Sequence, residues 1–193
     1  MKKKIFQVVG IIYFGLYFVH CVTASTRTNA VNTNGPAVGK FHIKYQSTDA
    51  QQSIFAKMLS VKLKKIGLSE SKENPDYYFN LTASVSQKGN LRHGVANAIG
   101  SNMATINVLV VPLFMKSLSI TITDKKQSIL WTGNVIEDET ECGLLGVTMP
   151  ELLTAIFENY PSDLLNKKRT FFWGNSEVGE IKDHFPNMDW SCN

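Results

Sequence analysis

The sequence has few cysteines and lacks the motifs that commonly hold a metal ion or a nucleotide. Its 193 residues include three cysteines, and none of them has a Cys or His neighbour at the spacing of a zinc site. The glycine-containing stretch 94–100 lacks the Gly-Lys-Ser/Thr ending of a phosphate-binding loop. The acidic stretch 137–141 lacks the calcium-loop pattern. We therefore expect no cofactor and no metal site.

Acidic residues are missing from the N-terminal part of the chain, where none precedes Asp49. Three of the 20 basic side chains are Lys2, Lys3 and Lys4, so the chain beyond them carries 17 basic and 16 acidic side chains, a net charge of +1. Nucleic-acid binding needs a basic stripe that neutralises phosphates. We therefore expect no nucleic-acid partner.

An apolar run from Ile5 to Val22 follows the three lysines. It ends in Val22-Thr23-Ala24, which presents small residues at the positions that a signal peptidase reads, so residues 1–24 are predicted to be a signal peptide. Lipidation at Cys21 is an alternative, although His20 is a poor residue before a lipidated cysteine. An uncleaved anchor is another, because about 18–20 apolar residues can span a bilayer. The expected location is the periplasm or the outer membrane, with secretion as an alternative.

Cys142 and Cys192 are the two cysteines outside this leader. An exported protein resides in an oxidising compartment, where two such thiols can pair. We therefore expect a disulfide between them, with two separate thiols as the alternative.

The remaining chain divides into a flexible spacer, residues 25–40, and a single domain, residues 41–193. The spacer prediction depends on a composition rich in Ser, Thr, Asn and Gly. Period-two alternation predicts strands, and helical spacing of apolar residues after two capping-box patterns, Thr48/Gln51 and Thr148/Glu151, predicts helices. The expected strands are 41–46, 77–85, an apolar run 106–114 that Pro112 interrupts, 118–123 and 129–136. The last two are expected to form a hairpin. The expected main helices are 48–66 and 148–160, with a further short helix over 162–168. This order predicts an α+β fold, a two-layer sandwich with a mixed sheet of about four to five strands and two main helices on one face.

Residues 87–105 are expected to form a long glycine-containing loop, with Arg92 and His93 as its charged spot. Long loops inside compact domains are often functional, so these two residues are the candidates for a binding loop. His93 could serve as an acid or base of a hydrolase, but no carboxylate or nucleophile has a sequence relation to it. The aromatic triplet 171–173 is expected to cover the sheet edge, or to contact a membrane or a partner. No residue is predicted to be catalytic.

Four segments resemble a diverse set of small bacterial envelope lipoproteins of uncharacterised function. They are Pro75–Phe79, Leu118–Asp124, the Leu-Trp-X-Gly segment Leu130–Gly133, and the helix ending at Tyr160-Pro161. The poor lipidation context of Cys21 departs from that set, and the tail 162–193 is additional. The resemblance covers roughly residues 41–161 and implies a non-enzymatic accessory domain at the envelope.

The expected function is therefore a non-catalytic envelope accessory protein with a binding or assembly role, tethered to a membrane at its N-terminus if the leader is lipidated or retained. Its protein or lipid partner is not indicated by the sequence. A hydrolase that uses His93 and a secreted effector are the alternatives.

Overall fold

The computed structural model describes residues 22–32, 34–45, 50–98 and 104–192. The lysines and most of the apolar run of the leader, together with Cys21, Thr48 and residues 99–103, lie outside these ranges.

A single seven-stranded sheet organises the described chain, in the order β3-β2-β4-β5-β6-β1-β7. Strand β2 is parallel to both of its neighbours, and every other pair of neighbours is antiparallel, so the sheet is mixed. The strands are β1 (Val22–Asn32), β2 (Gly39–Lys44), β3 (Leu68–Glu70), β4 (Tyr77–Ala98), β5 (Ala104–Asp124), β6 (Ile129–Thr140) and β7 (Leu164–Phe172).

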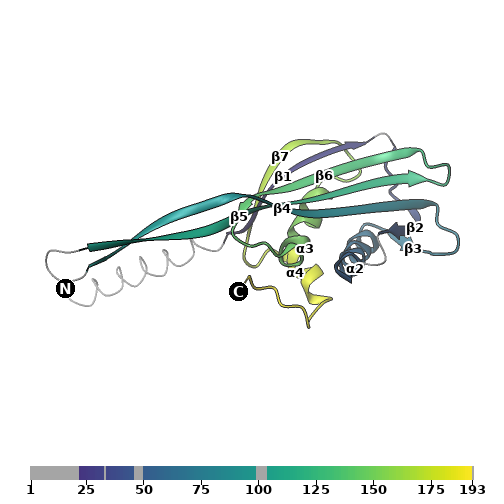
Figure 1. Ribbon diagram of the computed structural model, residues 1–193. Coiled ribbons are helices and arrows are strands. Elements are labelled where there is room, and N and C mark those ends of the chain that lie inside the picture. The colour runs from purple at the N-terminus through teal and green to yellow at the C-terminus, as the bar shows by residue number, and fades with distance from the viewer. Residues whose placement is uncertain (1–21, 33, 46–49, 99–103, 193) are drawn as a thin grey trace, which may run out of the picture.

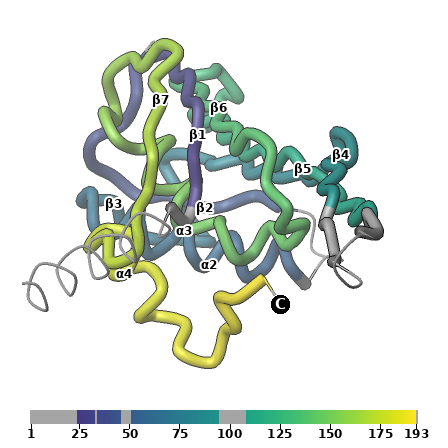
Figure 2. Tube along the Cα trace, turned by 90° about the vertical axis from the view of Figure 1, so that its left-hand side faces the viewer, coloured from purple at the N-terminus to yellow at the C-terminus, as the bar shows by residue number. Residues whose placement is uncertain are grey.

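Three helices lie on one side of this sheet, namely α2 (Ala50–Lys65), α3 (Leu145–Ile156) and α4 (Ser176–Asp183) (Figures 1 and 2). Helix α4 contacts both α2 and α3. The predicted sheet of four to five strands with two helices was therefore wrong in its strand and helix numbers within the described chain.

Strand β1 overturns the spacer prediction for residues 25–32. Residues 25–32 belong to a central strand that pairs with β6 on one side and β7 on the other. Its inward side chains are small, and all four are buried: Ala24, Thr26, Thr28 and Ala30. Helix α3 contacts β1, and small side chains allow a helix to lie close to a strand. The lack of large apolar residues, which suggested a spacer, therefore has a packing explanation.

The predicted hairpin of residues 118–123 and 129–136 is confirmed as part of the β5–β6 pair. Within it, the ring of Trp131 lies over Gly133, where an added Cβ would be 2.2 Å from the indole. Trp131 also stacks on Phe157 with ring centroids 5.7 Å apart. This explains the Leu-Trp-X-Gly pattern, because the glycine leaves the space that the indole fills.

Both main helix predictions were correct in type, but the second was wrong at both ends, because 148–160 was predicted and α3 spans Leu145–Ile156. Helix α2 ends at Lys65, and Gly67 has the φ of +100° expected of a residue that terminates a helix. Helix α3 begins at Leu145 rather than at Thr148. The Thr148 hydroxyl accepts a hydrogen bond from Lys116 instead of capping the helix. The short helix expected over 162–168 is also wrong, because those residues start β7.

Candidate functional site

The predicted loop 87–105 is wrong in its described part, because these residues continue β4 and β5 into a long two-stranded arm. The two strands pair with each other as far as Ala98 and Ala104. One bulge, between Gln87 and Gly89, shifts the register. Figure 1 shows the arm projecting away from the rest of the sheet. We define the arm as residues 88–98 and 104–113. At roughly 3.4 Å per residue its strands reach about 35 Å.

The neighbouring strands stop pairing before or at the start of the arm. Strand β2 pairs with β4 only as far as Asn80, and β6 pairs with β5 only as far as Phe114. In the part of the chain that the structure describes, the arm strands therefore pair only with each other. Pro112 lies just beyond the end of β6 pairing, where its missing N–H removes no hydrogen bond to β6.

Apolar side chains on the arm face solvent. Val108, Leu109 and Val110 are 60%, 56% and 51% exposed. Successive side chains of a strand point to opposite faces, so this run exposes apolar surface on both faces of the arm. Clustered exposed apolar residues mark interaction sites more often than single ones do. The arm is therefore the candidate binding element.

Its two strands differ in character. The described part of β5 on the arm is apolar from Val108 to Leu113. The facing β4 residues from Lys88 to His93 are mostly polar or charged, and Arg92 and His93 are both exposed there. In register, Arg92 faces Val110 and His93 faces Leu109. The predicted binding loop residues thus lie on a strand, next to apolar neighbours.

The strand register brings further features to the same end of the sheet. Moving from Lys116 toward the arm corresponds to moving toward Thr140 in β6, Val22 in β1 and Phe172 in β7. Phe172 and Trp173 are 60% and 82% exposed at this end, whereas Phe171 is fully buried. The aromatic triplet therefore covers the sheet with one ring and presents the next two outward. We call this region the arm end.

A buried ion pair lies at the base of the arm. Lys116 Nζ is 3.2 Å from Glu137 Oε2, and the two side chains are 0% and 3% exposed. The ammonium also donates a 3.0 Å hydrogen bond to the Thr148 hydroxyl of α3. These contacts connect β5, β6 and α3 at the point where the arm leaves the sheet.

Burial is the main influence on the ionisation of this pair. It lowers the pKa of Lys116 and raises the pKa of Glu137, while their mutual attraction acts in the opposite direction on each. Such a pair is costly to bury and strongly destabilising to break on one side. Its contacts are with the scaffold, so we interpret it as a structural group that fixes the arm base.

Sequence reasoning missed both members of this pair, although a signal was present. The inward positions of β5 are Leu118, Ile120 and Ile122, and Lys116 continues their period-two phase. Glu137 continues the phase of Trp131 and Val135 in the same way. A lysine and a glutamate at inward positions of adjacent strands predict a buried pair.

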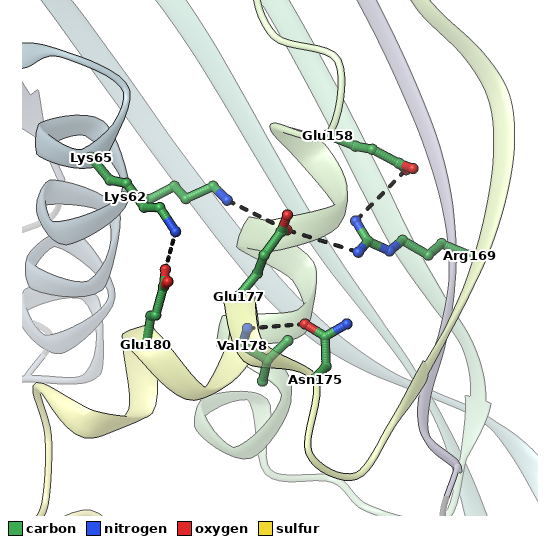
Figure 3. A network of polar contacts seen from close by, with 8 residues as sticks. All are labelled: Lys62, Lys65, Glu158, Arg169, Asn175, Glu177, Val178 and Glu180. Carbon is green, nitrogen blue, oxygen red and sulfur yellow. Dashed lines mark hydrogen bonds and ion pairs between the residues drawn. The ribbon is translucent and has the colours of Figure 1, made fainter.

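A second set of charges fixes α4 against α2 and β7 (Figure 3). Glu177 lies 3.9 Å from Lys62 Nζ and 3.8 Å from Arg169, and Lys65 pairs with Glu180. Further contacts hold the two ends of α4: Asn175 accepts a 3.2 Å hydrogen bond from the Val178 amide, and Lys182 pairs with the buried Glu151 at 2.9 Å. This network is structural in the same sense as the pair at the arm base.

The predicted disulfide between Cys142 and Cys192 is present, with Cα atoms 5.6 Å apart. Cys142 follows the end of β6, so the bond holds the C-terminal segment near the arm end. Cys21, the candidate lipidation site, lies outside the described residues, one position before β1.

A cavity of about 710 Å³ lies between β2, α2 and the segment after α4. Its lining is rich in cations and contains one acidic residue, Glu70: the basic side chains are Lys44, Lys57, Lys64, Lys72, His42 and His184. Glu70 is already engaged by Lys64 at 2.9 Å and by the Ser60 hydroxyl at 2.8 Å. By charge, this cavity suits an anionic group rather than a cation.

Among the residues with described positions, no group of three or more His, Cys, Asp or Glu side chains is arranged to hold a metal ion. Within the same ranges, none of the helices combines the length and the apolar character needed to cross a membrane.

No family model and no curated protein matches the chain. A solved PDZ domain protein from Parabacteroides distasonis ATCC 8503 has a similar fold, with a TM-score of 0.51 and 11% sequence identity over 82% of this chain and 41% of that chain. The present chain thus spans less than half of that protein.

Two structures of the PelC dodecamer from Paraburkholderia phytofirmans are more distant, with TM-scores of 0.37 and 0.38 and identities of 12% and 11%. Both cover 67% of this chain, and 93% and 94% of their own chains. At these identities the likeness concerns the fold alone, and the PelC scores are too low to carry an argument.

Proposed function

We propose that this protein is a non-catalytic accessory of the cell envelope, with a binding or assembly role for which the arm is the binding element. The observation that carries the proposal is the exposed run Val108–Val110 on a two-stranded projection. A projection of this length makes few contacts with its own domain, so folding alone gives little reason for its apolar surface. The predicted export leader is the support for an envelope location.

The hydrolase alternative has less support from the geometry. His93 is exposed on the arm and faces Leu109 in the β4–β5 register. Its cross-strand partner is therefore an aliphatic side chain, which cannot orient an imidazole as a carboxylate would.

Site-specific photocrosslinking in bacterial cells that express the full chain tests the proposal. A photoreactive residue replaces Leu109 on the arm, and in the control it replaces Leu165, which is 73% exposed and lies at the opposite end of β7 from Phe172. We expect adducts with an envelope component, whether lipid, protein or a second copy, at position 109 and not at 165.

The His93→Ala protein should give the same adducts. The proposal is wrong if position 109 reacts no more than position 165, or if the protein turns over an envelope substrate and His93→Ala abolishes that turnover.

A further inference from the structure

Three apolar features converge on the arm end. The first is the exposed run Val108–Val110, and the second is the pair Phe172 and Trp173 at the end of β7. The third is the chain itself, because the register places Val22, the start of β1, at this end. The sequence directly before Val22 is the apolar run that begins at Ile5.

We propose that the arm end rests on a membrane surface, with the arm lying in the headgroup region. The inference builds on the proposed function, since it names the partner of the same arm. Phe172 and Trp173 then occupy the interface, where aromatic rings are enriched because one part of the ring is apolar and another is wet. Val22 pairs with Phe172, so a leader that is lipidated at Cys21 or retained would join the described fold at this end.

The unpaired outer edges of the two arm strands determine how deeply the arm can lie in the membrane. Backbone N–H and C=O groups need hydrogen-bond partners, and the hydrocarbon core offers none to an open edge. The described arm strands pair only with each other, so their outer edges require water, lipid esters or headgroups. The arm therefore lies in the interface rather than in the hydrocarbon.

The difference in polarity between β4 and β5 determines how the arm is oriented on the membrane. Apolar β5 faces the ester region next to the acyl chains, where lipid esters and water still reach its open edge, and polar β4 faces the headgroups. The chain has no acidic residue between Asp76 and Asp124, so no carboxylate on the arm opposes an anionic surface. Lys88 pairs with Glu139 at 3.1 Å, which leaves Arg92 as the arm cation best placed to meet lipid phosphates. Anionic headgroups are therefore preferred.

A second copy of the chain is the competing occupant, because two arms could pair through their free edges. Pairing of that kind uses the arm alone. It gives no role to the exposed rings of Phe172 and Trp173 or to the position of Val22, which is why the membrane is favoured.

The test uses the full chain with Cys21→Ser and a single cysteine introduced as Leu109→Cys, which carries a polarity-sensitive fluorophore. The matched control is Leu165→Cys at the far end of β7. Vesicles of phosphatidylcholine and phosphatidylglycerol are then added. The emission maximum of the label at position 109 should shift to the blue, and iodide should quench it much less. The label at position 165 should still be quenched by iodide. The fluorophore reports only on its own surroundings. If the protein binds vesicles through its leader alone, iodide quenches the labels at positions 109 and 165 equally, and this outcome would overturn the inference.

A second variant, Phe172→Cys, reports on the same end without altering the arm and should behave as position 109 does. Arg92→Gln should weaken the phosphatidylglycerol-dependent signal about fivefold, whereas Lys126→Gln, in the distant β5–β6 turn, should not. Disulfide crosslinking between two Leu109→Cys arms, without any lipid response, would overturn the membrane inference and leave the proposed binding role standing. If photocrosslinking at position 109 fails, both the membrane inference and the proposed binding role of the arm are wrong.

Discussion

Lys116 and Glu137 form an ion pair at 3.2 Å in which neither side chain has more than 3% of its surface exposed, at the base of the arm. The pair connects β5, which continues into the arm, with β6, which stops pairing at the arm base, and a hydrogen bond to Thr148 links it to α3. It therefore links the binding element to the scaffold.

Removing one member of this pair should destabilise the fold strongly. Glu137→Ala leaves a buried ammonium without its carboxylate, so we expect the free energy of unfolding to fall by about 3–5 kcal/mol. Urea denaturation followed by circular dichroism measures this change.

The double variant Lys116→Met/Glu137→Leu removes both charges and should recover most of the loss. The exposed pair Arg27–Asp138, at 3.2 Å, is the control, and Asp138→Asn should cost less than about 1 kcal/mol. Equal losses in the buried and exposed variants would contradict a special role for the buried pair.

Gly133→Ala should also destabilise the core. An added Cβ would meet the indole of Trp131 at 2.2 Å and Ile156 at 2.8 Å, so the cost should be about 1–3 kcal/mol. Thermal unfolding followed by tryptophan fluorescence checks this. Gly179→Ala in α4 is the control, since an added Cβ there meets nothing within 4 Å and should stabilise the helix by about 0.5–1 kcal/mol.

The Cys142–Cys192 bond closes a segment with a sequence separation of 50 and should stabilise the fold. Cys142→Ser/Cys192→Ser is expected to lower the free energy of unfolding by about 2–4 kcal/mol, because the unfolded chain gains freedom. The double variant should also be cleaved faster by a protease within the C-terminal segment that follows Asp183. Cleavage at an unchanged rate would show that α4 and its ion pairs alone hold the C-terminal segment.

Glu70 should contribute a pH-dependent part of the stability. The hydrogen bond from Lys64, helped by one from Ser60, holds the pKa of this carboxyl below its ordinary value of 4.5. A lowered folded-state pKa gives stability that is present above the unfolded value and is lost as the pH falls through the folded value. Glu70→Gln should therefore be less stable than the parent at neutral pH, and this difference should shrink in acid. The control is Glu141→Gln, in the exposed turn after β6, which should change the free energy of unfolding at neutral pH by less than about 0.5 kcal/mol.

In place of the predicted cleavage after Ala24, we expect the mature chain to retain Val22–Ala24, which belong to β1. Ala24 is buried and pairs with Phe171, so cleavage after Ala24 would remove the paired start of β1. Intact-mass measurement of the exported protein reads the N-terminus directly. A mass that begins at Ser25 would contradict this prediction, and a lipid mass on Cys21 would support it.

Local sequence patterns determined a large part of the scaffold. Period-two alternation identified the strands around Ile120 and Trp131, and helical spacing identified α2 and the body of α3, because these periodicities follow from backbone geometry alone. The disulfide followed from compartment and cysteine number. These features depend on neighbours in the chain.

The tertiary structure alone decided what depends on distant partners. β1 consists mostly of small and polar residues, yet it is a central strand, because β6, β7 and α3 accept its small inward side chains. The glycine-containing stretch after Ser86 is a strand because β5 pairs with it to Ala98. Lys116 and Glu137 follow the inward phase of their strands, but only the β5–β6 register brings their charges together. Pairing partners far along the chain supply the energy in each case, and a local pattern cannot specify them.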